Sequence, residues 1–138
     1  MSLVLTQEGA KLLWNNVLGL LPAIGTPWLH LLGLPYVPLH TSNQTNFVAN
    51  ELAAAGYVEQ PVVGGGNWAF ANIPQGVGAS HLPIQFNIAI ACTIYGYWLA
   101  DGTDTVSLWG EKFTTPFLFD PINGPFYLTL LPSLISLP

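Results

Sequence analysis

The side chains best suited to metal binding or nucleophilic catalysis are few in this chain and widely spaced. Its histidines are His30, His40 and His81, and Cys92 is its single cysteine. Zinc sites usually draw paired ligands from short spacings, which this set lacks, so the sequence predicts no metal site. We interpret His30 as a satisfied core or interface histidine, because it lies in an apolar run, and Cys92 as a small buried hydrophobe.

Acidic pairs are the other possible source of chemistry, because two carboxylates about 5 to 10 Å apart can hydrolyse a glycosidic bond. Asp101 and Asp104 are close in sequence, but they fall in an expected hairpin turn, where Asp is favoured for backbone reasons. Glu111-Lys112 is expected as an exposed pair on the next strand. The glycine run 64–66 lacks the Lys-Ser/Thr of a phosphate loop. We therefore expect no enzymatic activity and no cofactor.

Charge is unusually scarce. Only 7% of the 138 residues are charged, 51% are hydrophobic, and the net charge is −5, whereas an average domain is about 25% charged. With two lysines and no arginine, the chain is not expected to bind nucleic acid, whose phosphates require basic side chains. Prolines and glycines interrupt the longest apolar stretch, 17–39, so no membrane span is expected. Surface this poor in charge predicts a homo-oligomer, with a trimer favoured.

The N-terminal region has the pattern of an amphipathic helix. Thr6 suits the N-cap, apolar residues recur at helical spacing, and Gly19 can end the helix, so we expect one near residues 6–18. It should cover one end or edge of the sheets. Residues 33–46 are expected as a long loop, and Phe47–Ala55 as either a short helix or a polar loop.

Most of the remaining chain predicts strands. They are expected at 27–32, 57–63, 68–73, 82–91, 93–100, 106–113, 117–119 and 126–131. In the run 82–91, large apolar residues alternate with polar or small residues with a period of two. The Asp101-Gly102 turn predicts a β-hairpin, whose arms carry Trp98 and Trp109 as candidate cross-strand neighbours.

Short strands with frequent turns predict one all-β domain over residues 1–138. We expect an antiparallel β-sandwich, jelly-roll-like, with the N-terminal helix added. The predicted core is Leu12, Leu13, Val17, Leu29, Leu31, Ile84, Phe86, Ile88, Ile90, Tyr95, Tyr97, Leu108, Leu128 and Leu130.

A series of motifs follows in order along the chain. It comprises Leu5, Thr6, Gly9 and Leu13 in the first helix, Trp28-Leu29-His30-Leu31, the segment Glu51 to Tyr57, Thr93-Ile94-Tyr95-Gly96-Tyr97, and Leu108-Trp109-Gly110-Glu111-Lys112-Phe113. In this order they resemble a family of small tailed-bacteriophage virion proteins. The resemblance implies a β-rich structural component of the particle and carries over no catalytic residue. The proline-rich segment 33–40 and the low charge depart from the family pattern.

The expected function is therefore that of a non-enzymatic virion structural protein. A capsid decoration or cement protein is favoured, with other copies of the chain, the major capsid protein or other virion proteins as partners. The alternative is a tail, baseplate or fibre component that binds a host-surface glycan through exposed aromatic rings. The candidate contact residues are Trp28, Trp68, Phe70, Phe117, Phe119, Leu134, Ile135 and Leu137.

Overall fold

The computed structural model describes residues 4–6, 25–35, 38–39, 41–63, 67–73, 76–131 and 133–135. Within them strands predominate, and every strand pairing is antiparallel, which confirms the all-β class. The expected helix over residues 6–18 lies outside the described residues except for Thr6. The predicted core residues Leu12, Leu13 and Val17 lie outside them too.

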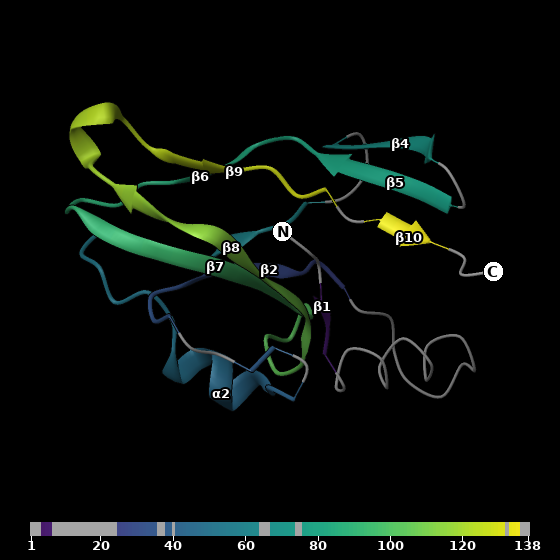
Figure 1. Cartoon of the computed structure of the whole chain (residues 1–138), viewed down its shortest axis with the longest axis horizontal. Coiled ribbons are helices and arrows are strands. Elements are labelled where there is room, and N and C mark those ends of the chain that lie inside the picture. Colours follow the sequence, from purple (N-terminus) through teal and green to yellow (C-terminus); the bar gives the residue numbers. More distant parts are fainter. Residues whose placement is uncertain are drawn as a thin grey trace.

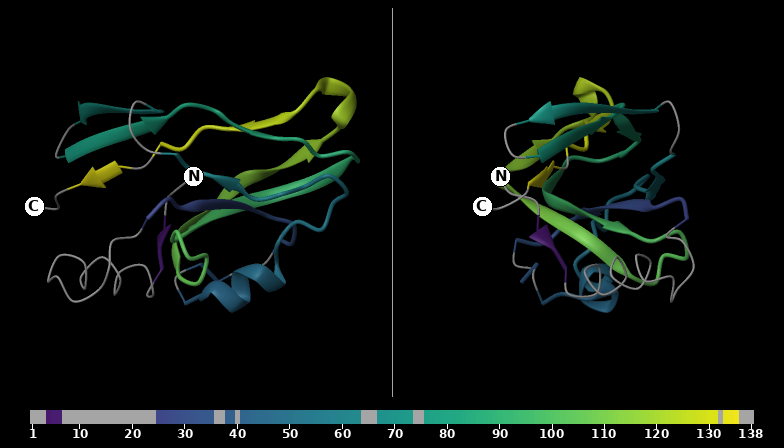
Figure 2. Two further views of the ribbon diagram at one scale, coloured as in Figure 1. Left: turned by 180° about the vertical axis from the view of Figure 1, so that it is seen from behind. Right: turned by 90° about the vertical axis from the view of Figure 1, so that its right-hand side faces the viewer.

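The described strands form three sheets. The largest has the order β1 (Val4–Leu5), β8 (Ser107–Phe119), β7 (Cys92–Ala100), β2 (Trp28–Leu32) and β3 (Gln60–Pro61). The second has the order β10 (Ser133–Ile135), β5 (Gly76–His81) and β4 (Trp68–Ile73), and the third pairs β6 (Ile84–Phe86) with β9 (Phe126–Leu128). Figure 1 shows the two small sheets on one side of the five-stranded sheet and the helix α2 (Gln44–Ala49) on the other. The views in Figure 2 show the same arrangement.

The β7–β8 hairpin confirms the strand and turn pattern read from the sequence. Asp101 organises the turn, because its Oδ1 accepts hydrogen bonds from the backbone N–H groups of Thr105 and Val106 at 2.9 and 2.8 Å. Strand β8 extends to Phe119, so residues 117–119 belong to it and do not form the separate strand that was expected.

The tryptophans of the hairpin are not cross-strand neighbours. Trp98 pairs with Gly110, whereas Trp109 pairs with Leu99. This offset of one residue places the two indole rings on opposite faces of the sheet. The expectation of a Trp98–Trp109 contact was therefore wrong.

Helix α2 begins earlier than expected. The Asn43 side chain accepts a hydrogen bond from the Asn46 backbone N–H at 3.0 Å, and the Asn46 side chain accepts one from the Asn43 backbone at 3.3 Å. This capping box starts the helix inside the polar segment that was expected to be a loop. The helix ends at Ala49 instead of continuing to Ala55.

Several expected strands are shorter in the structure, and three of the described strands were missed. Only Gln60–Pro61 of 57–63, Ile84–Phe86 of 82–91 and Phe126–Leu128 of 126–131 form strands. Strands β1, β5 and β10 were not expected. The alternation still holds through Ile88, which is buried, but Ile90 is 48% exposed. Its assignment to the core was wrong, because residues 87–91 pair with none of the described strands and so do not keep the period of two.

Most of the described part of the predicted core is confirmed. Leu29, Leu31, Ile84, Phe86, Ile88, Tyr97, Leu108 and Leu130 are buried, and Leu128 packs against them while partly exposed. Tyr95 instead packs partly buried on the α2 side, with Trp98. The register of β7 shifts between Ile94 and Gly96, so Tyr95 and Tyr97 face opposite sides. Glycine is required at position 96, because a Cβ there would overlap the Glu111 carbonyl oxygen.

Candidate functional site

His30 is the centre of a buried polar network on the α2 side of the five-stranded sheet. Strand pairing places it opposite Trp98, and its imidazole ring stacks on the indole with centroids 4.3 Å apart and planes 6° apart. Only 2% of the residue is exposed. The interpretation of His30 as a satisfied core histidine is confirmed.

Both ring nitrogens of His30 are bound to carboxylates. Nδ1 lies 2.6 Å from Glu51 Oε2, and Nε2 lies 2.8 Å from Asp104 Oδ1. An ionised carboxylate can only accept, so both nitrogens donate and the ring is an imidazolium. Burial lowers the pKa of His30, but the hydrogen bonds and charges of Glu51 and Asp104 outweigh it, and the pKa is raised.

A tyrosine hydroxyl holds Glu51 in place. Tyr57 donates to Glu51 Oε2 at 2.7 Å and accepts from the Leu31 backbone N–H at 2.9 Å. Burial and the bond to Glu51 raise the pKa of Tyr57, so the hydroxyl keeps its proton. The loop after α2 is thereby tied to strand β2.

The position of Asp104 is fixed by a hydrogen bond from α2 and by the backbone conformation of its own turn. Its Oδ1 accepts a hydrogen bond from Gln44 Nε2 at 3.1 Å, and Gln44 Oε1 accepts one from the Trp98 indole N–H at 3.2 Å. The backbone of Asp104 has a φ of 56°, a left-handed conformation that Asp tolerates better than most residues. The turn therefore does more than connect two strands, because it places a carboxylate within hydrogen-bond distance of His30.

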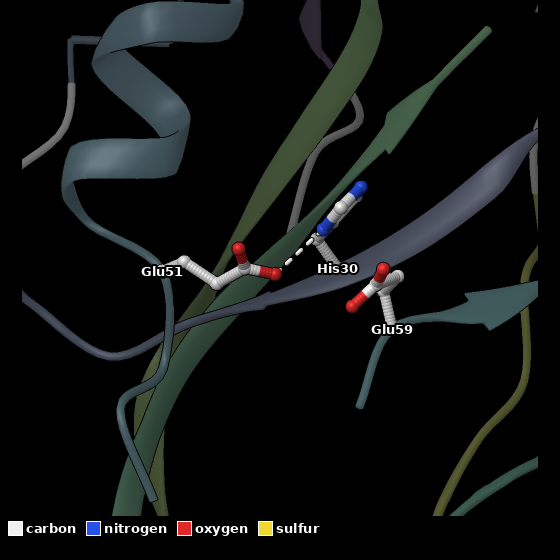
Figure 3. Close-up of side chains that lie close together, drawn as sticks. All are labelled: His30, Glu51 and Glu59. Carbon is white, nitrogen blue, oxygen red and sulfur yellow. Dashed lines mark hydrogen bonds and ion pairs between the residues drawn. The ribbon is translucent and has the colours of Figure 1, made fainter. Parts of the chain in front are cut away.

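Glu59 brings a third carboxylate to the site. It directly precedes β3, whose register pairs Leu29 with Gln60, so Glu59 lies opposite His30 at the sheet edge. One ligand atom each from His30, Glu51 and Glu59 lie within 4.8 Å of one another, and Figure 3 shows these side chains together. Glu59 is partly buried and makes no hydrogen bond or ion pair with another described residue. These three side chains could hold a cation.

A second candidate site is apolar and lies where β8 ends and β9 begins. Between these strands the 3-10 turn η2 (Pro121–Asn123) forms the tip of the connection (Figure 1). Large side chains are exposed here: Phe117 by 47%, Leu118 by 79%, Ile122 by 86% and Tyr127 by 56%. We call these residues the tip surface. Phe117, Leu118 and Tyr127 line a shallow cavity of about 290 Å³, whose lining also includes Asp120 and Asn123.

The structure separates the predicted contact residues into different environments. Trp28 and Trp68 are partly buried, and the Trp28 indole donates to the Gly102 carbonyl at 3.3 Å. Phe117 belongs to the tip surface. Phe119 is only 5% exposed and packs in the chain's own core, so little of its side chain is available to contact another subunit. The side chains of Phe70, Leu134 and Ile135, and the whole of Leu137, lie outside what the structure describes.

Sequence reasoning missed how the acidic residues meet at His30. Asp104 was interpreted only as a turn residue, and Glu51 and Glu59 were not connected to any histidine. The available signal was a histidine inside an otherwise apolar strand, since a buried imidazole needs polar partners from elsewhere in the chain. The expected Glu111-Lys112 surface pair is partly buried, and Glu111 accepts a hydrogen bond from the Tyr97 hydroxyl at 3.3 Å.

None of the helices in the described part of the chain is long and apolar enough to cross a membrane. Searches of known protein families, curated proteins and solved structures found no match to this chain.

Proposed function

We propose that this chain is a non-enzymatic virion structural protein that acts by assembling with copies of itself and with other coat proteins, as a capsid decoration protein does. The observation that carries the proposal is the tip surface, where Leu118 is 79% and Ile122 is 86% exposed. Removing apolar surface of this kind from water is favourable by about 25 cal/mol per Å², against which the entropic cost of association must be set. The low charge of the chain supports the same interpretation.

The proposal includes a sandwich architecture, in which the small sheets together form a second layer over the five-stranded sheet. Support comes from the larger apolar cluster, in which Ile84 of β6 and Phe126 of β9 pack in one core with Leu29 and Leu31 of β2. The layers in Figure 2 are consistent with such a sandwich. Sandwiches of this kind present rigid edges and end loops, which suit assembly into a lattice.

Sedimentation velocity at micromolar concentration tests self-assembly. We expect the purified chain to sediment as an oligomer, with a trimer favoured, and a Leu118→Ser/Ile122→Ser variant to weaken association by at least about tenfold. The matched control is Val48→Ser/Val58→Ser, which removes two valines that are 52% and 58% exposed away from the tip surface. A monomeric wild-type chain, or equal weakening in both variants, would contradict the proposal.

Placement in the particle is a separate question with its own measurement. The number of copies per purified virion distinguishes the two locations. A number that matches the repeat of the shell lattice supports decoration of the capsid. A small number that matches the rotational symmetry of the tail contradicts it and supports a tail or baseplate component.

Glycan binding is the second candidate function, and one observation favours it. The exposed rings of Phe117 and Tyr127 lie at the cavity of about 290 Å³ together with the polar side chains of Asp120 and Asn123. Aromatic faces with nearby hydrogen-bonding groups are suited to sugars. A glycan array probed with the wild type, Tyr127→Ala and Tyr127→Phe tests this function. Binding that is lost in Tyr127→Ala and retained in Tyr127→Phe would support it, and no binding by the wild type would exclude it.

A further inference from the structure

We propose that His30, Glu51 and Glu59 bind one divalent cation of the Zn²⁺ type. The three donors come from strand β2, from the loop after α2 and from the residue before β3 (Figure 3). Their ligand atoms lie within 4.8 Å of one another, so small side-chain rotations would bring them to metal–ligand distances of about 2.0–2.2 Å. One imidazole nitrogen and two carboxylate oxygens form a mixed donor set that suits Zn²⁺ better than the all-oxygen preference of Ca²⁺.

The partners of His30 already hold it in the orientation of a metal ligand. Asp104 accepts from Nε2 at 2.8 Å, which leaves Nδ1 directed at Glu51. A carboxylate behind the coordinating imidazole is the usual partner that fixes the ring and raises its basicity. Tyr57 holds Glu51 in the same way through its bond of 2.7 Å to Oε2. Two of the three ligands are thus positioned by outer hydrogen bonds.

Charge gives an independent reason. Glu51, Glu59 and Asp104 surround a single imidazolium, so negative charge is in excess in a partly buried site. Glu59 has no hydrogen bond or ion pair with another described residue. Partly buried carboxylates without a partner are costly. A divalent cation would replace the proton on Nδ1, which leaves to solvent, and would compensate Glu59 as well as Glu51.

The experiment uses the full chain after treatment with a chelator. Calorimetric titration with ZnCl₂ is expected to give one ion per chain and to raise the melting temperature. Co²⁺ in place of Zn²⁺ should produce visible absorption bands that report an N/O site. Glu59→Gln is expected to weaken Zn²⁺ binding at least tenfold. Asp104→Asn, which removes the carboxylate behind His30 and one of the surrounding negative charges without removing a ligand, should weaken it about 10- to 100-fold.

Controls make each result decisive. Because Glu59 bonds to no described side chain and its charge has no partner there, Glu59→Gln should melt at least as high as the wild type when metal is absent, which separates a lost ligand from a failed fold. Glu111→Gln changes a partly buried glutamate on β8 outside the cluster and should bind Zn²⁺ normally. Absence of Zn²⁺ binding by the wild type, or equal affinity in Glu59→Gln, would overturn the site. Neither result would affect the assembly test on the tip surface.

Discussion

The two faces of the five-stranded sheet are stabilised in different ways. The face toward β6 and β9 carries the larger cluster, in which Phe86 and Ile94 have no exposed surface and apolar packing predominates. The face toward α2 has a small apolar cluster around Trp98 and beside it the hydrogen-bonded network of His30. The first depends on buried area, and the second depends on every polar group having its partner.

This difference determines how each face should respond to substitution. On the apolar face, the cost of a substitution follows the volume removed, and neighbouring side chains can partly close the gap. On the polar face, removal of one group leaves the others buried without partners, so small chemical changes should have effects out of proportion to their size. Substitutions of matched size on the two faces test this contrast.

The largest effect is expected on the apolar face. Phe86 has no exposed surface, and Phe86→Ala should lower the free energy of unfolding by about 3–5 kcal/mol, measured by urea denaturation. Leu82→Ala is the control, because Leu82 is 58% exposed and its truncation should cost no more than about 0.5 kcal/mol. Equal losses in the two variants would show that the cluster around Phe86 is not the core.

His30→Gln should have the next largest effect. The variant keeps a polar side chain but removes the positive charge that Glu51 and Asp104 share, and we expect a loss of about 2 kcal/mol by urea denaturation. Side-chain exposures of 22% for Glu51 and 35% for Asp104 keep this below the cost of a fully buried pair. A change below about 0.5 kcal/mol would mean that the network does not stabilise this face.

The stability of the hairpin turn that places Asp104 beside His30 should decrease at acidic pH. Burial raises the pKa of Asp101, but hydrogen bonds from Thr103 and from the Val106 and Thr105 backbone outweigh it, and the pKa is lowered from 3.8. Because the folded chain favours the ionised form, this stabilisation is complete above the unfolded pKa and is lost as pH falls below 3.8 through the folded value.

Asp101→Asn tests that pH dependence. We expect it to cost about 1–2 kcal/mol at neutral pH, and the difference from the wild type should shrink as pH is lowered below 4. Urea denaturation across this pH range provides the measurement. A difference that stays constant with pH would show that the charge of Asp101 does not stabilise the turn.

The smallest effect is expected at the N-terminus of α2. Asn43→Ala removes the side chain that accepts the Asn46 backbone N–H, at a cost of about 1 kcal/mol. Asn43→Ser preserves an N-cap acceptor and should stay close to the wild type. Both are measured by thermal unfolding. If both variants lose the same stability, the cap has no role in holding α2 against the sheet.

Features that depend on neighbours along the chain could be predicted from the sequence. Strand β2 was expected from its short apolar run, and the β7–β8 hairpin from two runs around Asp101-Gly102. The alternation through Ile84, Phe86 and Ile88 was also correct, because a period of two is a local property of a strand with one buried face. The capping box of α2 was readable in principle from Asn43 and Asn46, but the surrounding polar residues favoured a loop.

The features that only the tertiary structure determines depend on contacts between segments that are distant in the sequence. His30, Glu51 and Asp104 are separated by up to 74 residues in sequence, yet strand pairing and the hairpin turn bring them within hydrogen-bond distance. The irregularity at Gly96 directs Tyr95 toward α2, and the end of pairing after Phe86 exposes Ile90. Composition alone showed that the chain is apolar and poor in charge. Which side chains are buried and which share a site is determined by pairing register, because a shift of one residue exchanges the two faces of a strand.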